Sequence, residues 1–565
     1  MIAKLSAVEA RAEDKRFVQQ CSLSGLQTRL PLCWSTPADV PPSPKRTYRS
    51  HYLSLGWQDL PDPATWDQLS DFDLVLRLVD FSGLRPVLAQ RLGWTSARGQ
   101  IPFDPVSVFL LIGWQIDNSW ARTKTLENLA NNRYADYAAL FGFKDGVYPT
   151  EGGLRHFLSA LGRHSEVDGD TVLVEREEEE PVEVTIQYLN QFLVGAVTLI
   201  REAGLLSAEA WNQAQVCPDG MLLHAASCLR CASVQESCYQ PTSFDNPRPC
   251  PAKEKERQGC DCDTLACVAA CHHATPRDAE ARFVWYTGSN QPQSSPNRST
   301  DPAQKDKKKD GDPCYGYRSL PLLLADPHRR FHLPLLADFL AANEREEVPG
   351  TALLLQLPRF YPDLRLDAVA GDAGFGYEVF LRTVYTLGAK RVVDLRAHTT
   401  DKNKAQWPVR GYDDRGRPVC PFGYAFTANG FDASRQRYKW FCAQACLHDV
   451  QPRVPLAGSL YPPHDCPYQA STHPYGKILN LGERFADGSI RLARDLPVGS
   501  PAWKRLYHRA RNASEARYAT FEHWHLKRLL VYGGLRGKAF VYLADTWATL
   551  TTLARLVREA TFATT

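Results

Sequence analysis

The chain has 565 residues, which suggests about two to four domains at roughly 150 residues each. Its hydrophobic fraction of 44% suits a protein that buries a core, and its net charge of +3 by itself gives no indication of nucleic-acid binding. No run of about 18 apolar residues occurs, and the N-terminal residues lack the apolar segment of a secretory signal. We therefore expect a cytoplasmic protein without a membrane span.

The first part of the chain predicts an irregular region, a helical domain and a linker. We expect residues 1–95 to be irregular, with short helices. The helical domain covers 96–163, where the apolar pattern predicts helices at 106–116, 123–132 and 152–162, the last ending at Gly162. The acidic run at 177–180 predicts a linker over 164–184. A further helix is expected at 186–206.

The rest of the chain alternates between strands and helices, which predicts an α/β fold with a mixed sheet flanked by helices. The first part of this domain, 185–227, ends in two short strands or a tight hairpin around Asp219 and Gly220. Its continuation, 314–397, predicts in chain order a strand at 314–326, a helix at 333–346, a strand at 364–375, a helix at 377–388 and a strand at 389–397. The segments 228–313 and 398–500 differ in composition and are predicted to be insertions, the first rich in cysteine and the second β or irregular; residues 501–565 are predicted to be helical.

Two aspartates stand where ligands often bind in such sheets. Asp372 follows an apolar strand, and the carboxyl ends of strands in open α/β sheets face binding sites. Asp219 also follows an apolar stretch. Simpler interpretations remain open for both residues, because Asp372 could cap the next helix and Asp219 could belong to an ordinary Asp-Gly turn.

A third carboxylate lies on the basic C-terminal segment, where residues 501–565 hold eleven Lys or Arg against four Asp or Glu. Arg511 and Glu515 are four residues apart and so share a helix face. They could form only a surface ion pair, and the basic segment could be either a phosphate-binding surface or a solvated helix face.

Taken together, these segments resemble the DDE transposases of bacterial insertion sequences, in the subgroup with a Tyr-Arg-Glu signature on the last catalytic helix. Residues 99–130 and 152–162 resemble the N-terminal helical domain of that family. The segments 216–227, 314–324, 366–375 and 511–530 resemble its first-Asp strand, its Tyr-Gly-Tyr-Lys strand, its second-Asp strand and its Glu helix. The resemblance runs from about Gly99 to the C-terminus.

The resemblance implies a ribonuclease-H-like catalytic domain with Asp219, Asp372 and Glu515 as catalytic metal ligands. Two Mg²⁺ ions, with Mn²⁺ as a substitute, would be held about 3.5–4 Å apart, Asp219 bridging both. The reaction would be cleavage at the element ends followed by transfer of the freed 3′-hydroxyl to target DNA. We expect double-stranded DNA as partner, a homodimer in the DNA complex and a nucleoid-associated location in the cytoplasm.

The chain departs from the signature at several positions. Tyr507 is one residue too far from Arg511, and Glu522 stands where the family has a Lys, the nearest Lys being Lys527. Arg318 replaces the Lys of the Tyr-Gly-Tyr-Lys strand. Glu522 is the alternative third ligand, but Glu515 is favoured by its spacing from Arg511 and by its small neighbours. DNA contacts are expected from Arg511, Arg517, Lys527 and Arg528.

Nine cysteines between Cys217 and Cys271 predict a zinc site in the first insertion, although unligated thiols remain an alternative. The candidate ligands are Cys228, Cys231, Cys260, Cys262, Cys267 and Cys271. A weaker set consists of Cys420, Cys442, Cys446 and Cys466. Two other functions remain open: a non-catalytic zinc-dependent DNA-binding protein, and a domesticated or inactive nuclease of the same fold.

Overall fold

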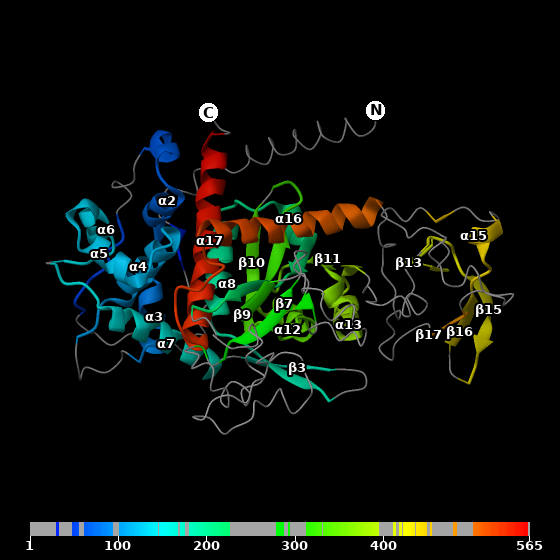
Figure 1. The fold of residues 1–565 in the computed structure, drawn as a ribbon. Coiled ribbons are helices and arrows are strands. Elements are labelled where there is room, and N and C mark those ends of the chain that lie inside the picture. The colour runs from blue at the N-terminus through cyan, green and yellow to red at the C-terminus, as the bar shows by residue number, and fades with distance from the viewer. Residues whose placement is uncertain are drawn as a thin grey trace, which may run out of the picture.

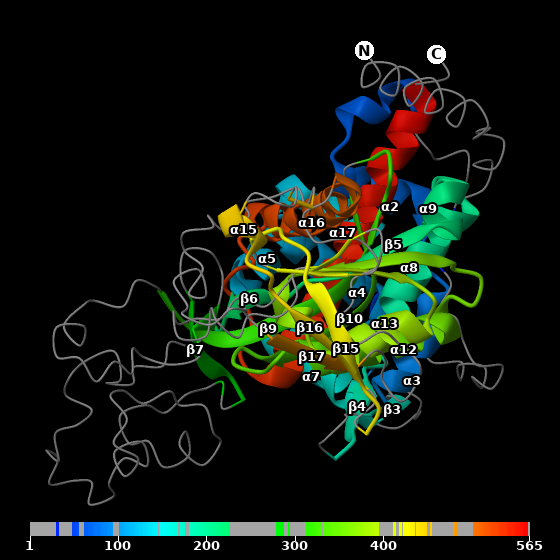
Figure 2. The same cartoon turned by 90° about the vertical axis from the view of Figure 1, so that its right-hand side faces the viewer.

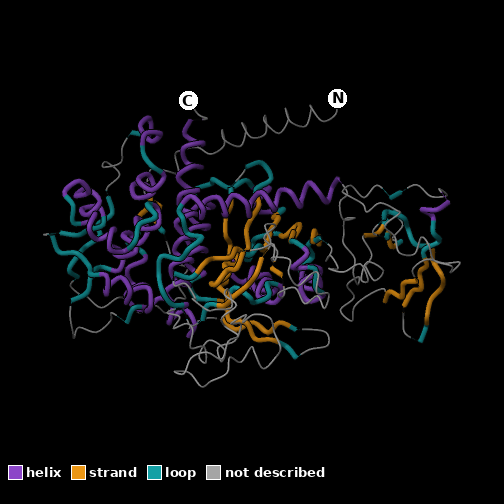
Figure 3. Tube along the Cα trace, in the orientation of Figure 1, coloured by secondary structure: helices purple, strands orange, loops and turns teal. Residues whose placement is uncertain are grey.

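The computed structural model describes residues 30–32, 48–55, 62–93, 101–144, 146–167, 170–175, 180–226, 278, 280–286, 292–293, 312–329, 331–394, 411–413, 417–420, 422–434, 437–448, 453–454, 478–482 and 501–562. They form a mixed α/β structure (Figure 1). Figure 3 shows helices gathered on one side and strands in the centre. Among the described helices, none combines the length and apolar composition that a bilayer-spanning helix needs.

The helical part precedes the sheet in sequence and packs against the last helix of the chain. Its elements are η3 (Pro63–Gln68), α2 (Asp71–Leu78), α3 (Leu84–Arg91), α4 (Pro105–Asp117), α5 (Arg122–Leu129), η4 (Asn132–Tyr134), α6 (Ala135–Leu140) and α7 (Glu151–Val167), with β1 (Leu30–Pro31) paired in parallel to β2 (Val79–Asp80). The expected helices of this region are therefore present. The short helices expected before residue 95 are also present, and α2 and α3 contribute to the main core.

The capping and packing of helix α4 stabilise the helical part. Asp104 caps it by accepting a hydrogen bond from the N–H of Val106 at 3.0 Å, and Pro105 occupies the first turn. Residues 105–116 are buried all round. A Cβ atom at Gly113 would lie 2.0 Å from the ring of Trp547, so only glycine lets α17 (Gly534–Phe562) approach α4 this closely.

Two expectations in this region are wrong. Gly162 does not end its helix, since α7 continues to Val167. A Cβ atom at Gly162 would lie 2.1 Å from the carbonyl oxygen of Leu535, so this glycine serves a close approach of two segments. The segment expected to be a linker, 164–184, instead contains the end of α7 and most of an antiparallel hairpin, β3 (Asp170–Val174) with β4 (Val182–Ile186).

The central sheet has eight strands of mixed direction. They are β5 (Ala214–Pro218), β6 (Met221–His224), β7 (Arg282–Tyr286), β8 (Pro292–Gln293), β9 (Asp312–Ala325), β10 (His332–Ala341), β11 (Leu366–Gly371) and β12 (Lys390–Val393). Strands β12, β11 and β5 run parallel in that order, and β9 is antiparallel to β5. Strand β10 pairs antiparallel with β9 along its other edge.

The segment 333–346 is mostly a strand, not the helix that its apolar residues suggested. Strand β10 takes up residues 332–341, and its described side chains are buried up to Leu340. A short run that is apolar on both faces cannot be assigned to helix or strand from periodicity alone, and here pairing with β9 decides. The helix comes one element later, as α12 (Glu347–Phe360).

Strands β5 and β6 do not form a hairpin. Both pair antiparallel with β9, β5 at residues 322–325 and β6 at residues 316–319. They are therefore two parts of one strand line with unbroken register, and the interruption at Asp219 and Gly220 lies opposite Pro321, which has no N–H to donate. The N–H of Asp219 still donates to the carbonyl of Pro321 at 3.3 Å, and the Asp219 side chain lies, like that of Cys217, on the face of the sheet that α16 covers.

Helices cover both faces of the sheet. Ala368 and Ala370 of β11 pack with Trp503 and Ala510 of α16 (Pro501–His523), whereas the alternate residue Val369 belongs to the core on the other face. Helices α12 and α13 (Glu378–Thr386) pack together and lie on the side opposite α16 (Figures 1 and 2). Helix α8 (Asn190–Glu202), followed by α9 (Ala208–Asn212), packs with α17 and β10.

Among the described residues of 398–500, the elements are short strands and one short helix. They form β13 (Gly411–Tyr412) with β14 (Pro418–Val419), and the antiparallel sheet of β15 (Thr427–Asp432), β16 (Arg437–Phe441) and β17 (Ile478–Gly482), beside α15 (Ala445–His448). The three-stranded sheet stands apart from the central sheet, on the side away from the helical part (Figure 1).

Asp117 makes the stability of the helical part depend on pH. Burial, followed by repulsion from Asp73 and Asp71, raises the pKa of Asp117 to about 6. The folded chain then holds a proton that the unfolded chain releases near its ordinary pKa of 3.8. Stability from this group is complete below about pH 4 and is lost as the pH rises towards 6.

We expect Asp117→Asn to remove this part of the pH dependence. Urea unfolding at pH 4 and pH 7 should give a drop in free energy of unfolding that is smaller in the variant by about 1–2 kcal/mol, after a discount for partial exposure. The control is Asp136→Asn, an exposed carboxylate on α6, which should keep the parental difference. Equal pH dependence in the parent and in Asp117→Asn would contradict the assignment.

Candidate active site

The structure brings Asp219 and Asp372 to the same edge of the sheet. Asp219 follows β5 and Asp372 follows β11, and these two strands are parallel neighbours with Val216 opposite Val369. Carboxyl ends of parallel neighbours meet at one edge, which is why two residues 153 positions apart come together. Their proximity has an electrostatic consequence: burial, and next the charge of Asp219, raises the pKa of Asp372.

Asp372 also caps a helical turn. Its Oδ1 accepts a hydrogen bond of 2.7 Å from the N–H of Gly374, at the start of η8 (Ala373–Phe375). The capping interpretation of this residue is therefore correct. It does not compete with a role at the sheet edge, because a carboxylate accepts several contacts and the cap fixes its orientation.

Asp219 is held by a guanidinium. Nη1 of Arg511 donates to Oδ2 of Asp219 at 2.7 Å, and the Asp219 side chain is only 10% exposed. Burial alone would lower the pKa of Arg511, but the charge of Asp219 outweighs it and the net shift is upward. Arg511, which the sequence placed beside the site, thus contacts the first carboxylate directly.

A fourth carboxylate at this site, Glu346, was not predicted from the sequence. Burial raises the pKa of Glu346 to about 7, with Arg318 acting against this and Asp372 and Asp219 adding to it. Glu346 pairs with Arg318 of β9, and a Cβ atom at Gly220 would lie 2.6 Å from its Oε1. Glu346 was missed because the sequence placed it at the end of an expected helix, as one of several charged residues.

Two tyrosines of α16 complete the surroundings. The hydroxyl of Tyr518 donates to the carbonyl of Gly220 at 3.2 Å, within the interruption between β5 and β6. Tyr507 stacks on Trp503, with ring centroids 4.3 Å apart. Burial is the largest cause of the raised pKa of both hydroxyls, which keeps them protonated and able to donate.

Glu515 lies on α16 between the two residues that reach the interruption, Arg511 and Tyr518. At about 100° per residue it is turned by about 40° from Arg511 towards solvent, and it is exposed. Its neighbours Ala513 and Ser514 are buried against the sheet, so they do not open the approach that the sequence suggested. Within the part of the chain that the structure describes, no three acidic, histidine or cysteine side chains converge as a ready metal site.

Glu522 is placed differently from Glu515. It is 52% exposed near the end of α16 and pairs with Lys527. Tyr518 lies about one turn from both glutamates, but Arg511 lies about one turn from Glu515 and about three turns from Glu522. The geometry around Asp219 therefore favours Glu515 over Glu522 as the residue nearer the two aspartates.

Arg517 cannot contact DNA as expected. It is fully buried, with Nε 2.7 Å from Oδ1 of Asp545 and Nη2 2.7 Å from Oγ of Ser319. It lies on the face of α16 that packs on the sheet. This expectation is wrong because one Arg on an amphipathic helix cannot be assigned to a face without knowing which stripe is buried.

Lys527 and Arg528 do not continue α16, which ends at His523. The backbone around them pairs with β6 instead, since the N–H of Leu529 donates to the carbonyl of His224 at 2.9 Å. Both side chains are exposed, and Lys527 pairs with Glu522. DNA contacts from Lys527 and Arg528 stay a prediction.

The candidate zinc ligands of the first insertion, Cys228, Cys231, Cys260, Cys262, Cys267 and Cys271, lie outside the described residues. Of the weaker set, Cys420 and Cys442 belong to one apolar cluster with Phe422 and Phe426. Their sulfurs accept N–H hydrogen bonds of 3.4 Å from Tyr424 and Gln444. Cys466 lies outside the described residues.

No family model matches this chain, and no curated protein matches it.

The buried ion pair of Arg517 and Asp545 gives a direct test of the structural role of this arginine. Arg517→Met leaves a buried carboxylate without its partner, which should lower the free energy of unfolding by about 3–5 kcal/mol. The double variant Arg517→Met with Asp545→Leu should recover most of this loss, because both charges are then removed. The measurement is urea unfolding of the parent and both variants. A single variant as stable as the parent would show that the pair is not buried as described.

Proposed function

We propose that this chain is a DDE transposase that binds the ends of an insertion sequence, cleaves DNA phosphodiester bonds and joins the ends to target DNA. The observation that carries the proposal is the pair of aspartates at one sheet edge, on neighbouring parallel strands, with α16 and its Arg511 beside them. The chemistry of this site is hard oxygen donors next to a guanidinium, which suits a phosphodiester substrate.

The sheet supports a ribonuclease-H-like catalytic domain. Its central strands lie in the order β12, β11, β5, β9, β10, in which only β9 runs against its neighbours β5 and β10. In chain order this is fifth, fourth, first, second, third, so the strands that the resemblance assigns to the first and the second Asp are neighbours. Asp219 follows the first strand, Asp372 follows the fourth, and α16 comes after the second insertion with Glu515.

The two aspartates suit a divalent cation. Asp219 adds to the raised pKa of Asp372, and both aspartates add to that of Glu346, so negative charge is concentrated at this edge. Oxygen ligands of this kind are those that Mg²⁺ and Mn²⁺ prefer. Asp219 and Asp372 would hold the metal, with Glu515 reaching in from α16. Two bound ions would supply an activated water and stabilise the leaving oxygen.

The protein's own residues would prepare the site. Arg511 neutralises Asp219 and is placed to contact a phosphate oxygen that approaches this edge. Tyr518 fixes the interruption that presents Asp219, through the carbonyl of Gly220. Arg318 holds Glu346 against Gly220, which keeps a fourth carboxylate next to the pair.

The same proposal includes double-stranded DNA as partner, a homodimer in the DNA complex, a nucleoid-associated location in the cytoplasm and a zinc site among Cys228–Cys271. A domesticated or inactive nuclease, and a non-catalytic zinc-dependent DNA-binding protein, are the alternatives that the experiments below separate from it.

The first test removes the aspartates one at a time. Asp219→Asn or Asp372→Asn should abolish Mg²⁺-dependent strand cleavage and leave DNA binding largely intact, because each change removes a ligand charge without changing shape. The matched control is Asp367→Asn, since Asp367 lies on β11, the strand that Asp372 follows, but pairs with Lys390. Cleavage by either variant at near the parental rate would reject the site; DNA binding without cleavage in the parent would favour the non-catalytic alternatives.

The second test decides which glutamate on α16 acts. Glu515→Gln should remove cleavage, whereas Glu522→Gln should cost far less because Glu522 is turned to solvent with Lys527. Single-turnover cleavage of a labelled duplex measures both. The reverse order of losses would move the third ligand about 10 Å along the helix axis and exclude Glu515.

A further inference from the structure

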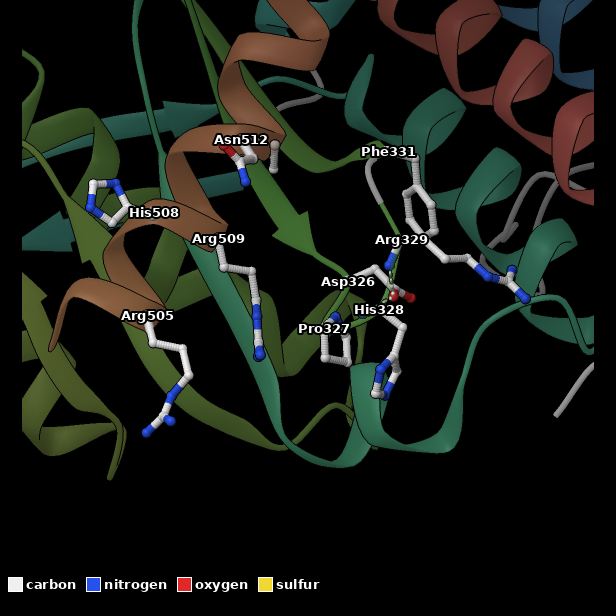
Figure 4. Close-up of a pocket in the computed structure, with 10 residues that line it drawn as sticks. Asp326, Pro327, His328, Arg329, Phe331, Arg505, His508, Arg509 and Asn512 are labelled. Carbon is white, nitrogen blue, oxygen red and sulfur yellow. Dashed lines mark hydrogen bonds between the residues drawn. The ribbon is translucent and has the colours of Figure 1, made fainter. Parts of the chain in front are cut away.

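A basic pocket lies on the side of α16 that faces away from Arg511. It has a volume of about 260 Å³ and lies between α16 and the turn that joins β9 to β10 (Figure 4). Figure 4 shows the side chains of Arg505 and Arg509 leaving α16 on the side where the turn with Pro327 and His328 lies. The lining residues are Asp326, Pro327, His328, Arg329, Phe331, Arg505, His508, Arg509, Asn512 and Ala513.

The two arginines from α16 are not neutralised by an ion pair. Arg505 and Arg509 make no hydrogen bond or salt bridge with any residue in the described ranges. The other charged groups are already engaged: His328 contacts Glu209 at 2.9 Å, and Asp326 accepts from the N–H groups of His328 and Arg329. An anion entering the pocket would therefore meet two unpaired guanidiniums.

Arg509 in particular lowers the stability of the fold as long as its guanidinium has no ion pair. It is half-buried, and burial lowers its pKa, while the more distant carboxylates of Glu209 and Asp326 act against this. A cation that loses water without gaining an ion pair is destabilised. A solvated surface arginine would show no such burial, so the pocket is better explained as a site that an anion completes.

The pocket and the aspartate pair lie near opposite ends of β5. Asp326 follows Ala325, which pairs with Gln215 at the start of β5, and Asp219 follows the end of the same strand. The length of β5 is about 13 Å at 3.3 Å per residue. One strand of DNA carries a phosphate about every 3.4 Å of helix axis, so this length corresponds to about four phosphates.

The exposed face of α16 extends between the pocket and the site at Asp219 and Asp372. Glu515, His508 and Asn512 are exposed on it, with Arg511 on one flank and Arg509 on the other. A strand with its scissile phosphate at Asp219 and Asp372 can cross this face and place a flanking phosphate in the pocket.

We propose that Arg505 and Arg509 bind a backbone phosphate of duplex DNA a few nucleotides from the cleaved bond. This rests on the proposed function, since it takes the DNA path from the carboxylate site. Together with Arg511, these two arginines supply the positive charge of α16 that the sequence had assigned in part to Arg517.

The test measures how the affinity for a short duplex depends on salt. Binding is followed by fluorescence anisotropy in EDTA, with the full-length parent and Arg505→Ala/Arg509→Ala, between about 50 and 200 mM salt. Each lost phosphate contact lowers the log-log slope by about 0.9, so the slope should become shallower by about 1 to 2 units. Arg505→Lys/Arg509→Lys should keep the parental slope.

A charge-matched control removes two exposed cations from the helical part, Lys124 and Arg133, both changed to Ala. It should keep a steeper slope than the pocket variant. An unchanged slope in the pocket variant, an equal loss in the control, or a parent that does not bind the duplex each overturns the proposal.

The cleavage assay separates the two proposals. If the parent cleaves DNA while the pocket variant keeps the parental slope, the pocket is wrong and the proposed function stands. If the parent binds through the pocket but does not cleave, the pocket stands and the transposase proposal fails. Urea unfolding of both double variants checks that any change in slope occurs in folded protein.

Discussion

The interruption between β5 and β6 is the feature on which the candidate site depends. Two stretches pair with the same strand, β9, in one register, and the interruption between them at Asp219 and Gly220 lies opposite Pro321, which has no N–H to donate. A Cβ atom at position 220 would displace the carboxylate of Glu346, so the glycine leaves room for that side chain. The carbonyl of Gly220 accepts from Tyr518, so this short segment presents Asp219 to Arg511, admits Glu346 and anchors α16.

Helix α16 combines two kinds of arginine on one element. Arg517 is a structural residue, because its bidentate pair with Asp545 and its bond to Ser319 tie α16 to α17 and β9 in the core. Arg511 is turned to the edge of the sheet and faces Asp219. The rigid attachment through Arg517 is what holds Arg511 and Glu515 in register with the carboxyl ends of β5 and β11.

The sequence was sufficient to predict helices and strands that follow from apolar spacing within one segment. It was insufficient where pairing with a distant strand decides between helix and strand. The helices around α4 and α8 and the strand ending at Asp372 follow from apolar spacing. Strand β10 could not be told from a helix, because its continuous apolar run fits either one and only the partner β9 distinguishes them. The place of Glu346 at the site could not be predicted for the same reason, since it depends on the strand before it and on the space left by Gly220.

Charge balance explains how so many acids share one edge. Asp219 is neutralised by Arg511 and Glu346 by Arg318, whereas Asp372 has a backbone N–H and the more distant guanidiniums. Desolvation and mutual repulsion raise the pKa of Asp372 and of Glu346, so this edge takes up protons more readily than separate carboxylates would. Arg511 donates to Oδ2 of Asp219, which leaves Oδ1 for a cation, because a carboxylate accepts several contacts. A guanidinium has several N–H donors, so Arg511 can keep its bond to Asp219 and still contact a phosphate that reaches this edge, which would link cation binding to DNA binding.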